Sequence, residues 1–180
     1  MLKIVNVPDP VLSQPVRPVT VFGPELNRLI QEMKRTLIAQ TDPEGVGLAA
    51  PQVGKNLALF IIKPGPDSSA EAFVNPEILQ SETRSRSPVS RSRKSKAKLE
   101  GCLSIPRIWG PVRRADKVLL EYQTAEGVKQ TRWFTGFKAV IIQHEVDHLR
   151  GVLFTQRSLE QKKPLYEEKD GKLVKLDSDL

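Results

Sequence analysis

The sequence is poor in the features that stabilise secreted proteins or anchor proteins in membranes. It has one cysteine in 180 residues, so no disulfide can form within the chain, which suits a reducing compartment such as the cytoplasm. It contains no run of about 18 apolar residues, and we therefore expect no membrane-spanning helix. Residues 1–5 show no charged leader followed by an apolar run, so we expect no secretion signal. These absences predict a cytoplasmic protein with no membrane contact.

Histidine is also scarce, and the two present, His144 and His148, are four residues apart. Residues at this spacing lie on one face of a helix, so both imidazoles can bind the same metal ion. Glu145 lies beside them, where its carboxylate can take a proton from a metal-bound water, as in the H-E-x-x-H motif. We predict a metal site here, with two surface histidines on an ordinary amphipathic helix as the alternative.

The residues around the motif favour the metal site. Four bulky apolar residues precede it: Phe137, Val140, Ile141 and Ile142. They cover most of the helix circumference, which predicts a buried helix that Thr135 can cap at its start and Gly151 can end. Buried histidines and a buried glutamate need partners, because an unpaired buried charge is costly, and a metal ion would supply them.

Cys102 is the only soft residue that could add a third protein ligand to the two histidines. Three protein ligands with one open position are typical of a catalytic metal site, whereas structural sites are closed by four ligands. Cys/His/His ligation by itself suggests zinc.

The net charge of +7 comes from one segment. Seven basic residues and no acidic residue lie between Thr83 and Leu99, and the rest of the chain is neutral. We interpret residues 83–99 as a basic, Arg/Ser-rich insertion that stays mobile because it has little hydrophobicity. A basic face spread over the whole protein is not indicated. The insertion is either only solvated or a contact to RNA.

The length of the chain predicts one domain over residues 1–180, long enough to bury a core. Residues 1–22 are interpreted as an extended arm with turns, and apolar spacing predicts an amphipathic helix from Pro24 to about Gln40. Strands are predicted at 57–62 and at 72–74, where Asn75-Pro76 ends the second one. Residues 117–123 and 128–134 predict a hairpin, as do the runs flanking Asp170-Gly171.

Residues 45–54 are rich in glycine and alanine and superficially match the dinucleotide-binding pattern G-x-G-x-x-A. That interpretation fails because residues 41–44 are polar and turn-like where a strand is needed, and Pro51 disfavours the helix that should follow. We expect instead a tight loop of small residues that lets the backbone approach a ligand. Gln52, at its end, could donate from its side-chain amide, although a simple surface turn remains the alternative.

Three motifs occur in order: Gly45-x-Gly47-x-Ala49-Ala50-x-Gln52, Glu100-Gly101-Cys102-Leu103-Ser104, and His144-Glu145-x-Asp147-His148. Together they closely resemble the signature motifs of the peptide deformylases, and the similarity extends over most of the chain. The resemblance implies an α+β fold in which antiparallel β-sheets pack around a central H-E-x-x-H helix, with an additional N-terminal helix. It also implies hydrolysis of the formyl group from the N-terminal formyl-methionine of new polypeptides, with release of formate.

The resemblance further implies roles for individual residues. Cys102, His144 and His148 would hold one divalent metal ion, Fe²⁺ natively, with Zn²⁺, Ni²⁺ or Co²⁺ able to replace it. Glu145 would be the general acid/base. Gln52 and the backbone N–H of Leu103 would stabilise the oxyanion. The expected substrate-binding residues are Val46, Gly47, Glu100, Gly101, Phe137, Val140 and Ile141. The four bulky apolar ones are candidates for a methionine pocket, because Phe137, Val140 and Ile141 share the helix face of His144. Plain core packing is the alternative for these four, above all for Val140.

The expected partners are formyl-methionyl nascent peptides, bound by a monomer. The chain departs from the resemblance at residues 83–99, which are longer and more basic than expected before the Glu-Gly-Cys motif. We interpret this insertion as a flexible flap or as a transient contact to the ribosome, which would depend strongly on salt.

Two other functions compete with this interpretation. A zinc peptidase with a third histidine would need histidine where Phe154 stands, and one with a glutamate ligand would have to use Glu167 or Glu168, in a predicted hairpin. A non-catalytic RNA-binding protein would use the basic insertion and would not need Glu145. The set of metal ligands distinguishes the peptidase from the deformylase interpretation, because a peptidase would still bind its metal after the loss of Cys102.

Overall fold

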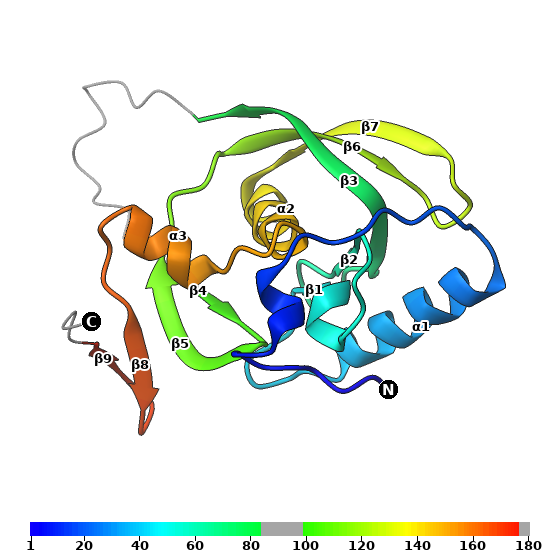
Figure 1. The fold of residues 1–180 in the computed structure, drawn as a ribbon. Helices are drawn as coiled ribbons and strands as arrows, with labels where there is room; N and C mark the ends of the chain where they lie inside the picture. Colours follow the sequence, from blue (N-terminus) through cyan, green and yellow to red (C-terminus); the bar gives the residue numbers. More distant parts are fainter. Residues whose placement is uncertain (84–98, 177–180) are drawn as a thin grey trace.

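The computed structural model describes residues 1–83 and 99–176, so the basic insertion predicted at 83–99 lies almost entirely outside the described residues. Within the described part, two antiparallel sheets and three α-helices are arranged around helix α2 (Gly136–Leu149), as Figure 1 shows. The α+β class and the central position of the motif helix, both predicted from the sequence, are confirmed.

The larger sheet has the strand order β1-β2-β3-β6-β7, and every neighbouring pair is antiparallel. Its strands are β1 (Gly47–Ala49), β2 (Leu59–Ile62), β3 (Glu71–Glu82), β6 (Lys117–Gln123) and β7 (Lys129–Thr135). Side chains alternate along β6, so that Val118, Leu120 and Tyr122 face inward. They pack with α2 and with the aromatic ring of Phe73, which makes one continuous core behind the motif helix.

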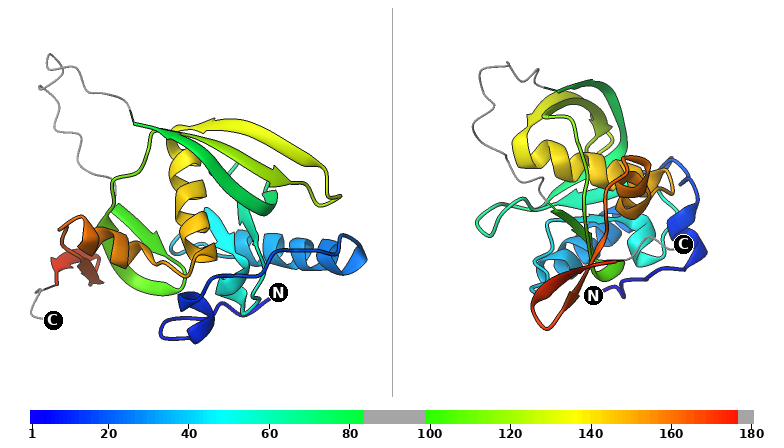
Figure 2. Two further views of the ribbon diagram at one scale, coloured as in Figure 1. Left: turned by 45° about the horizontal axis from the view of Figure 1, so that its top comes forward. Right: turned by 90° about the vertical axis from the view of Figure 1, so that its left-hand side faces the viewer.

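The smaller sheet has the order β4-β5-β8-β9 and carries the Glu-Gly-Cys motif on its first strand. Its strands are β4 (Leu99–Cys102), β5 (Ile105–Pro111), β8 (Tyr166–Lys169) and β9 (Lys172–Lys175). Figure 2 shows α2 running from beneath β3, β6 and β7 toward β4 and β5. This arrangement brings residues about 45 positions apart in the sequence, on β4 and α2, into contact.

Helix α1 (Pro24–Ile38) confirms the predicted N-terminal amphipathic helix. Proline occupies its first turn, where its fixed φ suits a helix and its missing N–H costs nothing. Its inward face carries Leu26, Ile30, Met33 and Leu37, all buried at helical spacing against β1 and β2. This apolar stripe is core.

The ends of α2 differ in part from expectation. Thr135 is the N-cap residue, yet its side chain makes no capping hydrogen bond, so the predicted capping role is wrong in its detail. Gly151 follows the helix with a left-handed φ of 71°. A β-carbon at this glycine would lie 2.6 Å from the backbone nitrogen of Gln14. The close approach of the N-terminal arm therefore requires glycine here, beyond the requirement of the turn itself.

Strand β3 is far longer than the predicted strand at 72–74, because Asn75-Pro76 does not end it. The pairing with β6 shifts register between Val74 and Glu77, so the proline lies at a bulge where no ladder hydrogen bond is lost. Asn75 adopts a left-handed φ of 48°, and its side chain bonds both the N–H and the carbonyl of Val19. These bonds to the N-terminal arm compensate for the irregular backbone.

Four shorter elements were also not predicted. The N-terminal arm contains a 3-10 helix, Pro10–Ser13, capped by the Asp9 carboxylate. The segment expected to be a loop of small residues forms strand β1 and then a 3-10 helix, Ala50–Val53, in which Pro51 occupies the first turn. Helix α3 (Phe154–Glu160) follows α2 directly. The predicted strand and hairpins at 57–62, 117–134 and around Asp170-Gly171 are confirmed.

None of the helices among the described residues has both the length and the apolar character that crossing a bilayer requires.

Candidate metal centre

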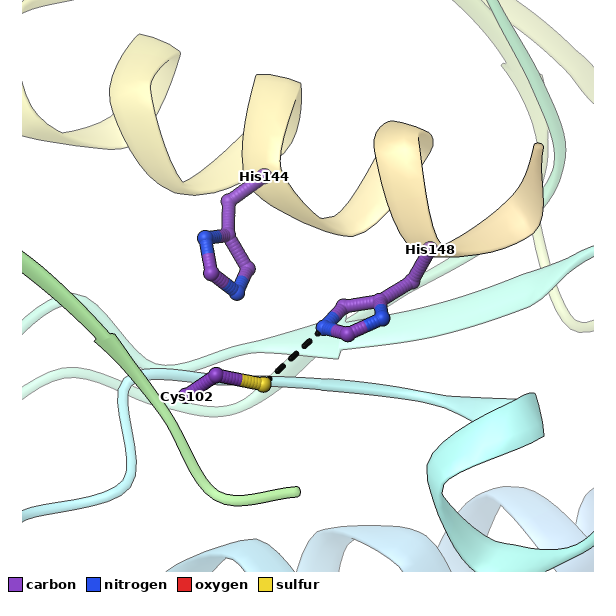
Figure 3. A group of neighbouring side chains, drawn as sticks. All are labelled: Cys102, His144 and His148. Carbon is purple, nitrogen blue, oxygen red and sulfur yellow. Dashed lines mark hydrogen bonds between the residues drawn. The ribbon is translucent and has the colours of Figure 1, made fainter. Parts of the chain in front are cut away.

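The only group of three or more potential metal-ligating side chains among residues 1–83 and 99–176 is Cys102, His144 and His148. Their ligand atoms all lie within 4.8 Å of one another, and Figure 3 shows the three side chains converging between β4 and α2. The sulfur of Cys102 lies 3.2 Å from Nε2 of His148. Bonds from zinc to nitrogen and sulfur are about 2.0–2.3 Å, so side chains this close can share one ion.

The two histidines differ in their electrostatic environment. Burial, followed by the nearby His144, lowers the pKa of His148 well below its usual value, which keeps this ring in the neutral form that coordinates metals. Burial also acts to lower the pKa of His144, but hydrogen bonds with Cys102 and Glu100 outweigh it and raise the pKa well above the usual value. The groups that favour a proton on His144 would also favour a metal cation in the place of that proton.

Glu100 orients His144 from outside the cluster. Its Oε2 lies 2.9 Å from Nδ1 of His144, which leaves Nε2 of that ring to face the sulfur of Cys102. Burial acts to raise the pKa of Glu100, yet the hydrogen bonds with His144 and Arg114 lower it below the usual value. A carboxylate that holds the far nitrogen of a ligating histidine is a recurrent arrangement in metal sites, because it fixes the ring and its tautomer.

Arg114 supports Glu100 and was not identified from the sequence. Its guanidinium bonds both carboxylate oxygens of Glu100 at 2.9 Å, and its third nitrogen contacts Asp147. Asp147 in turn accepts hydrogen bonds from Arg157 at 2.8 and 3.2 Å. Nothing in the local sequence marks Arg114, because its partners are 14 and 33 positions away. Asp147 was part of the recognised motif, but its partners were not predicted.

Gln52 lies at the end of the 3-10 helix, directly against the sulfur of Cys102. Its Oε1 accepts the backbone N–H of Ala49 at 2.8 Å, and its Nε2 donates to the Cys102 sulfur at 3.4 Å. The side chain is buried and held at both ends, so its amide N–H points into the cluster. Leu103 follows Cys102 in the turn between β4 and β5, which places its backbone beside the same site.

Glu145 lies against strand β1. A β-carbon at Gly47 would overlap its Oε1 and would come within 2.7 Å of its Cδ, so this glycine makes room for the carboxylate. Burial raises the pKa of Glu145 to about 7, with Glu100 adding to the rise and His144 and Arg114 opposing it. Its Oε2 is buried without a hydrogen-bond partner in the described part of the chain. Such a carboxylate can exchange a proton near neutral pH.

The apolar residues expected to form a pocket differ in how deeply they are buried. Ile141 is buried, and its Cγ2 lies 2.9 Å from where a β-carbon of Gly47 would stand. Val46 and Val140 are half-buried, whereas Phe137 has 44% of its surface exposed, contrary to the expectation of a helix buried on most sides. Gly101 packs under the ring of Trp109, which a β-carbon would approach to 2.7 Å.

The donor set fits a divalent metal. It combines one sulfur and two imidazoles, of which one is held by a buried carboxylate and the other has its Nδ1 unpaired among the described residues. The buried, unpaired carboxylate oxygen of Glu145 lies beside them, on the same helix. The arrangement can hold an ion of the zinc type, leave one position open to a ligand, and provide a proton acceptor next to it.

Comparison with known proteins gives one consistent result. The family model described as polypeptide deformylase matches residues 1–164. A peptide deformylase of Desulfotalea psychrophila is 36% identical over 173 residues, which are 94% of each chain. Peptide deformylase 1 of Bacillus subtilis is 37% identical over 155 residues, covering 86% of this chain and 88% of the relative.

The similar solved structures are also peptide deformylases. The crystal structure of the peptide deformylase from Thermotoga maritima superposes with a TM-score of 0.75 at 35% identity, covering 87% of this chain and 97% of the other. A peptide deformylase from Synechococcus elongatus, crystallised in complex with actinonin, gives a TM-score of 0.75 at 32% identity, covering 89% and 87%.

Proposed function

The chain belongs to the polypeptide deformylase family, and we propose that Cys102, His144 and His148 hold the metal ion on which its reaction depends. As a member of this family, the protein is a hydrolase that removes the N-terminal formyl group from nascent polypeptides. The single observation that carries the metal assignment is the convergence of one thiol and two imidazoles within 4.8 Å.

A divalent metal ion bound there would supply a water of lowered pKa, about 7, and a Lewis acid for the formyl oxygen. The surrounding residues prepare the site for this ion. Glu100 fixes the ring of His144, and Arg114 holds Glu100 by two hydrogen bonds of 2.9 Å. Because these partners are buried and mutually bonded, the donor atoms keep their positions without the ion having to organise them.

Glu145 is our proposed general acid/base. Burial raises its pKa to about 7, and its Oε2 has no partner among the described residues, so the carboxylate is available to a proton. It takes a proton from the water that attacks the formyl carbon and delivers one to the leaving amine. Formate and the free N-terminal amine are then the products.

Gln52 and the backbone N–H of Leu103 are our proposed oxyanion donors. Support for Gln52 comes from its amide, which is fixed by Ala49 and directed at the cluster through the 3.4 Å contact with the Cys102 sulfur. A donor fixed before the reaction stabilises charge that develops on the formyl oxygen without reorganisation.

We propose that the formylated residue is methionine and that its side chain lies between Val46, Phe137, Val140 and Ile141. Ile141 would form the base of this pocket, since it is buried, and the exposed ring of Phe137 would form its rim. Gly47, Glu100 and Gly101 would line the path of the peptide. The close packing at Gly47 and Gly101, where a β-carbon would collide with Glu145 or Trp109, supports the need for bare backbone on both strands.

We infer Fe²⁺ as the native ion, with Zn²⁺, Ni²⁺ or Co²⁺ able to replace it, although a thiol with two imidazoles suits zinc equally well. We also propose that residues 1–180 form one domain and act as a cytoplasmic monomer without membrane contact, and the single cysteine supports the location. For residues 83–99, charge alone supports a transient contact to ribosomal RNA.

The reaction and the role of Glu145 are tested together by measuring formate release from a formyl-Met peptide. Protein reconstituted anaerobically with one divalent metal should release formate, and E145A protein of equal metal content should not. Release by E145A at the wild-type rate would overturn the proposed role of Glu145. Ribosome co-sedimentation at low salt, with and without residues 83–99, tests the RNA contact.

A further inference from the structure

A polar cleft of about 350 Å³ lies on a side of α2 away from the metal cluster. Its walls come from β3, β6, α2, α3 and the segment after β5, and its lining includes Ser81, Arg113, Arg114, Asp147, Arg150 and Arg157. The α2 residues that line it are turned by about a third of a turn from His144 and His148, since successive helical residues are about 100° apart. The cleft therefore contains none of the three metal-ligating side chains, and it shares only Arg114 and Asp147 with the network that supports Glu100.

Four arginines and one aspartate give this arginine cleft an excess of positive charge. Asp147 is shared between Arg114 and Arg157, and it is the only acidic residue in the lining. Arg114 is also neutralised by Glu100 and Arg157 by Glu160. Among the described residues, the ion pairs of the lining are therefore made by two of the four arginines.

Arg113 and Arg150 are the other two, and their guanidinium groups form no ion pair among the described residues. The backbone that carries Arg113 is fixed, because its N–H and carbonyl are both bonded by the side chain of Gln161. Arg150 is fixed at the C-terminal end of α2, where its N–H bonds the carbonyls of Val146 and Asp147. Arg113 and Arg150, which have no ion pair within residues 1–83 and 99–176, thus line one cleft from backbone that is held by hydrogen bonds.

The chemistry of the lining selects the type of ligand. Guanidinium groups present planar forks of N–H donors that match phosphate oxygens, and the charge-assisted bonds they form are about twice as strong as neutral ones. The volume is at the lower end of the range for small-molecule sites, roughly 300–1,000 Å³. It suits a phosphate group or a compact phosphate ester.

We propose that the arginine cleft is a binding site for a small phosphate-bearing anion, held by the Arg113 and Arg150 side chains that line it. Arg114 and Arg157 remain bonded to Asp147, and their charges add to the positive electrostatic potential in the cleft. The site requires neither the metal cluster nor the substrate pocket.

The test is calorimetric titration of metal-loaded protein with inorganic phosphate and, separately, with a nucleoside monophosphate, at ionic strength matched with chloride. The test variant is R113Q/R150Q. The control is R28Q/R35Q, which removes the same charge from the exposed face of α1. Both variants should melt and release formate like the wild type, because the four side chains lie on the surface and outside the metal cluster.

Binding of either anion to the wild type and to R28Q/R35Q, weakened at least ~10-fold in R113Q/R150Q, would support the proposal. The anion that binds with the higher affinity would show whether the ligand is free phosphate or a phosphate ester. Equal affinity in all three proteins would contradict the proposal, since it would place the anion elsewhere, for example at the metal. Binding of a short RNA without binding of either small anion would also contradict it.

Discussion

The carboxylate of Glu145 occupies the space that a side chain at Gly47 would need. An added β-carbon would overlap Oε1 of Glu145 and lie 2.9 Å from Cγ2 of Ile141. Two motifs almost 100 residues apart in the sequence thus meet at a contact that only glycine permits. The position of the proposed general base therefore depends on the lack of a side chain at Gly47 on β1, as well as on α2, which carries Glu145.

The contact between Gly47 and Glu145 predicts the effect of G47A. The added methyl group should displace the Glu145 carboxylate, and a displacement of the order of 1 Å can cost about 10²-fold in rate. We expect kcat for formate release to fall by about that factor while metal content stays at one ion per chain. The control is G65A, whose β-carbon would only reach ordinary contact, 3.6 Å from Ser68. Equal losses in the two variants would contradict this role of Gly47.

Glu100 is predicted to tune the metal affinity through His144. In E100Q the bond to Nδ1 of His144 loses its charge, and the buried Arg114 loses one of its two carboxylates. Loss of such a supporting group typically weakens metal binding by about 10–100-fold. Competition with a fluorescent chelator would measure this change, with E82Q, which removes an exposed pair with Lys117, as control. An E100Q protein with wild-type metal affinity would exclude this role.

Gln52 is predicted to affect the rate and not the metal. Q52A removes the amide donor beside Cys102, and loss of one oxyanion donor typically costs about 10²–10³ in kcat. The N–H of Ala49 also loses its acceptor, which should reduce the free energy of unfolding by about 1–3 kcal/mol. Single-turnover formate release at equal metal content separates the two effects. Unchanged single-turnover rates would remove Gln52 from the reaction.

Asp147 is predicted to stabilise the fold from the side of α2 next to the one that carries the histidines. Its carboxylate and the guanidinium of Arg114 are both more than 90% buried, so D147N would leave a buried cation with one charged partner instead of two. Breaking a buried pair typically costs about 3–5 kcal/mol. Urea unfolding of metal-loaded protein would measure the loss. E160Q, which removes only the exposed end of the same network, should cost less than about 1 kcal/mol. Similar losses in D147N and E160Q would show that burial of the pair is not decisive.

The sequence predicted the elements that depend on local patterns. The apolar spacing of α1, the hairpin of β6 and β7, and the Asp170-Gly171 turn all follow from residues a few positions apart. The fold class and the family followed from three motifs whose spacing is itself a sequence property. These predictions needed no knowledge of distant contacts.

The predictions that failed depend on contacts between distant segments. Strand β3 passes through Asn75-Pro76 because the side chain of Asn75 bonds the N-terminal arm at Val19, 56 positions away. Arg114 supports the site through its ion pairs with Glu100 and Asp147, and these residues come close to it only in the folded chain. The exposure of Phe137 likewise depends on how the start of α2 emerges from the core, which periodicity alone does not predict.

The most direct test of the account is X-ray absorption spectroscopy of the protein loaded with one zinc ion per chain. We predict a first coordination shell with one sulfur at about 2.3 Å and two imidazole nitrogens at about 2.0–2.1 Å, the sulfur being that of Cys102. In C102A the sulfur contribution should vanish and the metal affinity should collapse. A shell of nitrogen and oxygen alone in the wild-type protein, unchanged in C102A, would contradict the proposed metal centre.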